Sequence, residues 1–209
     1  VQIALTLALL VGAGLLVRTM RNLANVQTGY EISRVLTMSV TAVQGDWGDF
    51  HRRALLGVAA IPGIDGAAFA WGVPLTGNNW PNPIEIEGQP APAKPGDRIV
   101  LPVRAVTPNY FALLRQDIVD GRDFRDTDKR DALAVAIVNQ AFAERYFAGT
   151  NPIGKKLWIR SRQQPPAEII AVVKNSRTDD LTKAAEPEIY TSLWQNGAYS
   201  KHLVVRSTA

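Results

Sequence analysis

The first seventeen residues of the chain carry no charged side chain, and this feature constrains the possible folds more than any other. The run VQIALTLALLVGAGLLV is followed at once by Arg18 and Arg21 and then by an ordinary polar sequence. A helix of this length reaches about 25 Å, slightly short of a hydrocarbon core of about 30 Å. We therefore predict a membrane-spanning helix, and because the first residue is Val1 we expect the sequence to begin partway into it.

Two other interpretations of this run fit its residues less well. A cleaved secretory signal would end in small residues, whereas residues 15–17 read LLV. A buried helix of a soluble protein would keep a polar stripe, and only Gln2 and Thr6 are polar here. Residues 18–28 lack helix breakers, so the helix is expected to continue into water as a stalk.

The length and composition of the chain limit the number of domains that it can form and exclude several classes of function. After residues 1–30, in which Arg18 and Arg21 are the only charged residues, about 180 residues remain, enough for one domain or two small connected ones. This part holds 21 basic and 19 acidic residues, a balance too even for a nucleic-acid-binding protein. No cysteine is present, which excludes disulfides, thiol catalysis and zinc–thiolate sites.

Hydrophobic periodicity predicts that strands and helices alternate after the stalk. Asp46 is expected to cap a helix that begins at Trp47, and Asn139 is expected to cap another. Thr107 and Pro108 are expected to start a short helix. The predicted strands cover residues 35–41, 64–73, 99–106, 134–138, 157–160, 168–173, 188–193 and 202–206.

Residues 74–97 hold six prolines and are expected to form a long exposed excursion with at most one small strand. Trp80 lies in this excursion, where an aromatic side chain has little core to join. We expect Trp80 to contact a partner, the alternative being that it packs on its own loop. Trp71 and Trp158 fall within predicted strands and are expected in the core.

The residues that could carry chemistry do not form a recognised motif. His51, expected on a helix surface, and His202, expected in the last strand, are the only histidines. Glu85 and Glu87 face one side of a short strand, which permits a carboxylate pair, although a solvated strand face is the preferred interpretation. Residues 120–131 alternate acids and bases but lack the order of a calcium loop, so a solvated turn is expected. We predict no catalytic residue, no cofactor and no metal ion.

Several short motifs in the chain resemble the periplasmic core domain of MacB-type ABC transporter permeases (MacB-like or FtsX-like, as in the large permeases of acidobacteria). Individually they are weak, but their order and spacing are specific and extend over nearly the whole chain. One of them departs from the family, since AVVKN at residues 171–175 lacks the usual glycine before the valines. The motifs are VTPNYF, GRDF, AIVN, NPIGK and VVKNSR, together with the N-terminal apolar sequence ALTLALLVGAGLLVRTMRNL.

This resemblance implies an α+β fold with two subdomains. A porter-like subdomain with a split βαβ arrangement would comprise residues 33–116 and 199–209. A mixed α/β, sabre-like subdomain, inserted into it, would comprise residues 117–198. The truncated transmembrane and stalk helix, residues 1–28, would precede both.

The resemblance also implies a function. The globular part would be the extracytoplasmic (periplasmic) domain of a permease in the inner, cytoplasmic membrane, and the chain would continue past Ala209 into further transmembrane helices. Without catalysis of its own, it would couple ATP-driven movement of the membrane helices to efflux or to transport of envelope components. The implied partners are a separate cytoplasmic ATPase, a periplasmic adaptor protein, the membrane and a second copy in a homodimer, but no nucleic acid. The alternative is a sensory or ligand-binding ectodomain, which would need a concave pocket with convergent polar groups.

Overall fold

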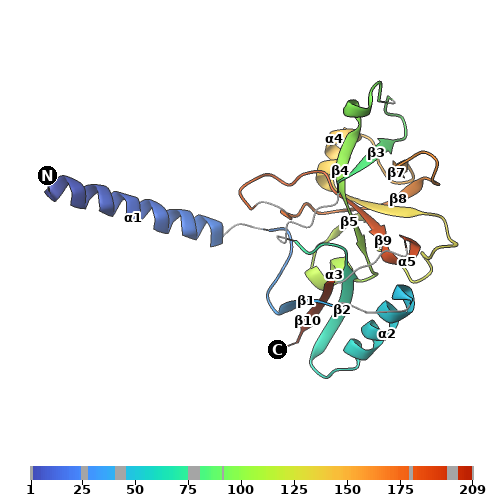
Figure 1. Cartoon of the computed structure of the whole chain (residues 1–209), viewed down its shortest axis with the longest axis horizontal. Helices are drawn as coiled ribbons and strands as arrows, with labels where there is room; N and C mark the ends of the chain where they lie inside the picture. Colours follow the sequence, from blue (N-terminus) through green and yellow to red (C-terminus); the bar gives the residue numbers. More distant parts are fainter. Residues whose placement is uncertain are drawn as a thin grey trace.

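The computed structural model describes residues 2–24, 28–40, 46–74, 81–90, 92–178, 181–196 and 202–208. These residues form a long helix and a mixed α+β body (Figure 1). The helices are α1 (Gln2–Ala24), α2 (Trp47–Ala59), α3 (Tyr110–Leu114), α4 (Gln140–Tyr146) and α5 (Leu193–Asn196), with a 3-10 turn η1 (Pro95–Asp97). The strands are β1 (Val35–Ser39), β2 (Ile64–Ala70), β3 (Pro81–Ile86), β4 (Ile99–Val106), β5 (Ile118–Gly121), β6 (Val135–Asn139), β7 (Lys156–Ile159), β8 (Ala167–Val173), β9 (Ile189–Ser192) and β10 (His202–Ser207).

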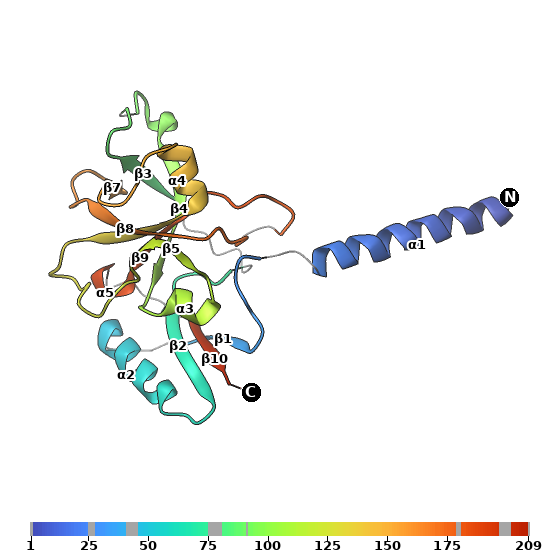
Figure 2. The same cartoon turned by 180° about the vertical axis from the view of Figure 1, so that it is seen from behind.

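Helix α1 extends away from the body, and Figures 1 and 2 show it from opposite sides. Its segment Gln2–Arg21 has a mean hydropathy of 2.0, and none of it is buried against the rest of the chain. Twenty residues of helix reach about 30 Å, the thickness of a bilayer's hydrocarbon core. The segment is therefore long and apolar enough to span a membrane. The helix ends at Ala24, and residues 25–27 of the expected stalk lie outside the described residues.

Strands β1, β10 and β2 form an antiparallel sheet in the lower half of Figure 1. Side chains alternate between the two faces of a strand, so neighbours in the sequence meet different helices. Phe69 and Leu203 lie with residues of α2 in one apolar cluster, whereas Ala68 and Val204 lie with residues of α3 in another. The sheet is thus covered by α2 on one face and by α3 on the other.

Strand β4 belongs to two parts of the body. Val106, at its end, pairs with Ala70 of β2, whereas residues 99–102 pair with β3 and residues 103–106 with β9. The pairings β4–β3–β7–β8–β6–β9–β4 close into a ring of strands in the upper half of Figure 1. Strand β5 pairs with β8 outside this ring. The expected subdomain boundary between residues 116 and 117 therefore has β-ladders crossing it, because β3 and β4 pair with strands on its far side.

The apolar core also joins the two parts. One cluster of buried residues includes Ala70 of β2, Leu113 of α3 and Val204 of β10 together with Ile137 of β6 and Val173 of β8. The other clusters are more local: one lies between the ring and α4, and one lies between α2 and the lower sheet. The lower sheet and the ring therefore form one continuous body.

Two of the expected helix caps are present. The side chain of Asp46 accepts a hydrogen bond of 2.7 Å from the amide of Gly48, in the first turn of α2. Asn139 accepts a bond of 2.9 Å from the amide of Phe142, in the first turn of α4. Both satisfy amides that the helix itself leaves unpaired.

The expected cap of α3 is wrong. The Thr107 hydroxyl accepts a hydrogen bond of 3.0 Å from the amide of Phe69 instead, and so links β4 to β2. The residue that precedes α3 is Asn109, in the left-handed conformation with φ of 68°. Asparagine tolerates this conformation better than most residues, so the chain turns into α3 without a side-chain cap.

Removing residues 1–27 should leave a chain that is soluble and monodisperse without detergent, because every buried apolar cluster lies after residue 28. The whole chain should oligomerise without detergent through the apolar surface of α1. Light scattering on both chains tests this expectation. Equal monodispersity would contradict the assignment of α1 as a membrane helix.

Candidate functional site

The described segment that follows α1, residues 28–34, is called the leader segment below. It enters β1, where Val35 pairs with Arg206 of β10, so the first and last strands of the body lie side by side. The end of β10 lies on the side of the body that faces α1 (Figures 1 and 2). The leader segment contacts two different parts of the body: the α3–β10 region and the loop of residues 174–178 that follows β8.

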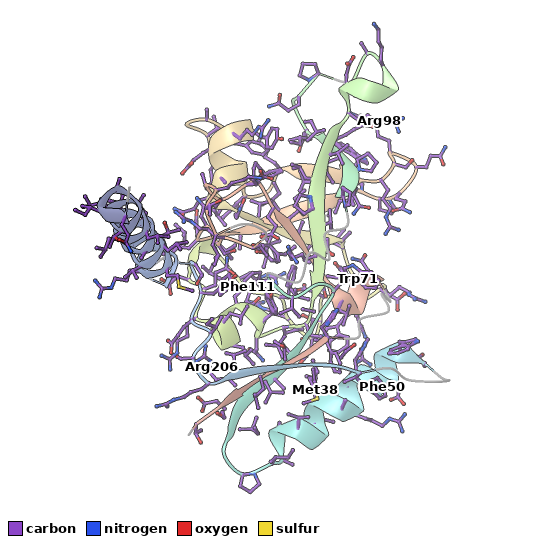
Figure 3. The ribbon with its side chains drawn as sticks, turned by 60° about the vertical axis from the view of Figure 1, so that its left-hand side comes forward. Met38, Phe50, Trp71, Arg98, Phe111 and Arg206 are labelled. Carbon is purple, nitrogen blue, oxygen red and sulfur yellow. The ribbon has the colours of Figure 1, made fainter. Side chains whose placement is uncertain are left out.

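The guanidinium of Arg206 fixes the leader segment to α3. The residue is 4% exposed, and Figure 3 shows it on the α1 side of the body. Its Nε donates to the carbonyl of Leu113 at 2.5 Å, and its terminal nitrogens donate to the carbonyls of Ser33 at 3.0 Å and Glu31 at 2.6 Å. The Leu113 carbonyl lies in the last turn of α3, where the helix offers no partner. One side chain thus satisfies three carbonyls from two distant segments.

Glu31 adds a cluster of charges at the same place. Its carboxylate accepts a bond of 2.6 Å from Arg115 and another from the Ser33 hydroxyl, and it lies 3.6 Å from Arg206. The Ser33 hydroxyl and the Arg115 charge outweigh burial and hold the pKa of Glu31 below its usual 4.5. With a lowered pKa, the stabilisation by this carboxylate is present above pH 4.5 and is lost as the pH falls through the lowered value.

The leader segment is bound equally closely to the 174–178 loop. The amide of Arg177 donates to the Thr28 carbonyl at 2.8 Å, and the hydroxyl of buried Tyr30 donates to the Arg177 carbonyl at 2.9 Å. Gly29 has φ of 84°, and a Cβ atom there would lie 2.1 Å from the carbonyl oxygen of Asn175. Only glycine fits this approach, because the two backbones leave no space for a side chain.

The 174–178 loop leads to a buried ion pair in the ring. The Thr178 hydroxyl donates to the Glu188 carboxylate at 3.2 Å, and the Tyr190 hydroxyl donates to it at 2.6 Å. Glu188 pairs with Arg104 of β4, and each is 3% exposed. Burial acts to lower the pKa of Arg104, but the charge of Glu188, together with Tyr190, Tyr110 and the hydrogen bond to Glu188, raises that pKa, so Arg104 stays charged. Burial, with Glu188, raises the pKa of Tyr190.

These contacts form one connected set from the leader segment to the shared strand β4. Their donors bind carbonyl and carboxylate groups of the same set, an arrangement that holds segments in place rather than one that activates a nucleophile. Among the residues that the structure describes, no group of three histidine, aspartate or glutamate side chains could hold a metal ion. The expected absence of cofactor and metal stays a prediction.

The expected histidine placement is partly wrong. His51 is 1% exposed rather than on the helix surface, and its ring lies 4.4 Å from that of Phe69. The polar neighbours of α2 had suggested exposure, but the helix packs this position against the sheet. His202 lies in β10 beside Leu203, which faces α2, so His202 is on the opposite face of the sheet from His51.

The structure also shows the surroundings of Trp71 and Trp158 and of the two carboxylates Glu85 and Glu87. Trp71 and Trp158 are half-buried rather than fully in the core, and the Arg162 guanidinium lies 4.5 Å from the centre of the Trp158 ring. Glu85 forms an ion pair with Arg162, and Glu87 accepts a bond of 2.9 Å from the amide of Lys156.

Trp80, the expected partner contact, lies outside the described residues. Its role stays a prediction.

The sequence gives only one signal for the leader contacts. Arg206 follows three apolar residues in the strand sequence HLVVR. A charged residue in such a strand suggests a buried partner. The partners of Arg206 are mainly carbonyl groups, which no sequence motif identifies. Tyr30 and Gly29 stand in an ordinary polar stretch, and their closeness to the 174–178 loop depends on the tertiary fold.

Replacing Arg206 with Met should leave the three carbonyls without this donor and lower the free energy of unfolding by about 3 kcal/mol. The control is Arg34→Met, because Arg34 is exposed and donates to the Thr208 carbonyl alone among the contacts described, so it should cost about 0.5 kcal/mol or less. Urea unfolding followed by tryptophan fluorescence measures both. Equal losses would show that Arg206 has no special role.

Comparison with known proteins identifies the family. The family model described as the MacB-like periplasmic core domain matches residues 3–208, and no curated protein matches the chain. The extracellular domain of the noncanonical ABC-type transporter YknZ from Gram-positive bacteria is similar in structure, with 18% identity, a TM-score of 0.54 and coverage of 84% of each chain. The periplasmic region of MacB from Actinobacillus actinomycetemcomitans has 13% identity and a TM-score of 0.58, with coverage of 89% of this chain and 79% of that one.

At these identities the two structures establish a shared fold. The family match extends over nearly the whole sequence, as the motifs had indicated. The chain therefore belongs to the family of MacB-like periplasmic core domains of ABC transporter permeases.

Proposed function

We propose that the globular body transmits movement of the membrane helix α1 into the periplasm and carries out no chemistry itself. The observation that carries this proposal is the double attachment of the leader segment. Residues 28–34 are bonded to α3 and β10 through Arg206 and to the 174–178 loop through Tyr30. A displacement of α1 would therefore act on both regions of the body at once.

The proposal extends to the division into two subdomains. The porter-like part would comprise residues 33–116 and 199–209, and the sabre-like part residues 117–198. Two features support a coupled movement of these parts over independent motion: β4 pairs with strands on both sides of the boundary, and one buried cluster includes residues of both. Such a body would rotate or tilt as a unit, which is one of the known ways in which domains switch between states.

The setting of this movement is also a proposal. ATP hydrolysis by a separate cytoplasmic ATPase would move the helices of a permease in the inner membrane, and the body would pass the movement to efflux or to transport of envelope components. A periplasmic adaptor and a second copy of the permease would be its partners. The length and hydropathy of α1 support the membrane attachment on which this setting depends.

The test uses the complete permease with its ATPase in lipid vesicles. A fluorescent donor on the exposed Glu144 of α4, attached through a cysteine introduced there, reports its distance from acceptor dyes at the bilayer surface. We expect ATP turnover to change the energy transfer in the parent protein. Gly29→Ala should abolish most of this change while ATP hydrolysis continues, because its Cβ atom would push the leader segment away from Asn175.

Gly63→Ala is the matched control. Gly63 has φ of 85°, almost the same as Gly29, but a Cβ atom there would meet nothing closer than 3.7 Å. Both variants carry the strain of the left-handed conformation, about 1–2 kcal/mol, and only one disturbs the leader contact. If Gly29→Ala keeps the full change in energy transfer, or if the parent shows none, the proposal is wrong.

A further inference from the structure

A groove with a volume of about 490 Å³ lies between the ring and the lower sheet, away from the leader segment. Its walls come from β3, β4, β7, β9 and α5, and from Trp71, which follows β2. Figure 3 labels Trp71 beside α5. The volume is within the range of small-molecule sites, which is about 300–1,000 Å³. The groove takes no part in the contacts described for the leader segment.

The described residues of the groove lining combine an apolar surface with one charged side chain. Trp71, Val103 and Ile159 are half-buried and supply apolar surface, and the polar remainder includes Thr191 and several side-chain amides. Among the described lining residues Arg160 is the one charged residue. A ligand with an apolar body and one negative charge would match this lining, since the apolar surface buries the body and the cation attracts the charge.

The conformation of Arg160 supports a binding role. Its φ is 72°, in the left-handed region that arginine rarely adopts. The conformation is held by its amide, which donates to the Pro83 carbonyl at 2.8 Å, and by its Nε, which donates to the side chain of buried Asn82 at 3.0 Å. Strained residues that are fixed in this way are concentrated at functional sites. The guanidinium is thereby positioned at the groove before any ligand arrives.

We propose that this groove binds amphiphilic anions. The apolar body would lie on Trp71, Val103 and Ile159, and a carboxylate or similar anionic group would bind Arg160. This site is independent of the proposed transmission of movement, because it shares no residue with the leader contacts.

Fluorine NMR titration of the whole chain in nanodiscs of zwitterionic lipid tests the site, with empty nanodiscs subtracted. The probes are a fluoronaphthoate and the matched neutral fluoronaphthamide, which differ in charge and little in shape. The naphthoate should bind saturably and about tenfold more tightly than the naphthamide, as expected for one charge-assisted contact. Equal affinities, or no saturable binding, would overturn the proposal.

Four variants locate the binding. Arg160→Gln should remove the preference for the naphthoate, and Arg160→Lys should retain part of it, which separates charge from misfolding. Arg162→Gln is the matched control, because Arg162 is two residues away and is not among the described lining residues. Val103→Phe should weaken both probes by filling the floor of the groove. If Arg162→Gln lowers the preference as much as Arg160→Gln does, or if Val103→Phe weakens neither probe, the ligand binds elsewhere and the proposal fails.

Discussion

The guanidinium of Arg206 holds together three segments that the sequence places far apart: the leader segment, the end of α3 and the last strand. A buried guanidinium is stable only when its donors find acceptors, and carbonyls buried beside it need donors in return. Here the guanidinium supplies the donors and the three carbonyls supply the acceptors. The Glu31 carboxylate lies close by and balances the charge. The entry of the chain into the body is therefore fixed by a side chain of β10, the strand that pairs with both β1 and β2 in the lower sheet.

From the leader segment, two hydrogen bonds and one ion pair lead into the ring. Tyr30 reaches the 174–178 loop, Thr178 of that loop reaches Glu188, and Glu188 pairs with Arg104 on β4. Breaking a buried ion pair by removing one partner typically costs about 3–5 kcal/mol, so the pair keeps β4 and the loop in a fixed relation. Under the proposed function this stiffness is the useful property, because a body that bent at the leader segment would absorb the movement of α1.

Much of the fold could be predicted from the sequence, because local signals and tertiary packing agree in most elements. The period-two pattern located strand β1, and the Asp46 and Asn139 caps located two helix starts. Closure of the ring could not be predicted, since it depends on pairing between β4 and β9, which are far apart in sequence. Thr107 misled the prediction because the same hydroxyl that can cap a helix can also bond a neighbouring strand.

The candidate site was less predictable than the fold. Its key groups are backbone carbonyls, one glycine and single side chains of common types, and their function depends on positions that only the folded chain defines. The family itself could be identified from motifs, because VTPNYF, GRDF and NPIGK recur in order even though each is weak. These motifs report the fold, and none of the three includes a residue of the leader segment.

Native-state hydrogen exchange on the unmodified chain in nanodiscs tests the fixed attachment of the leader segment most directly. The amides of Glu31, Arg177 and Ser207 each donate across the attachment, to the carbonyls of Leu114, Thr28 and Arg34. If the attachment is rigid, these three amides should exchange as slowly as those of the β10–β2 ladder, because they open only when the body unfolds. Exchange as fast as in the exposed turn at residues 162–164 would show that the leader segment detaches freely, and would contradict the account.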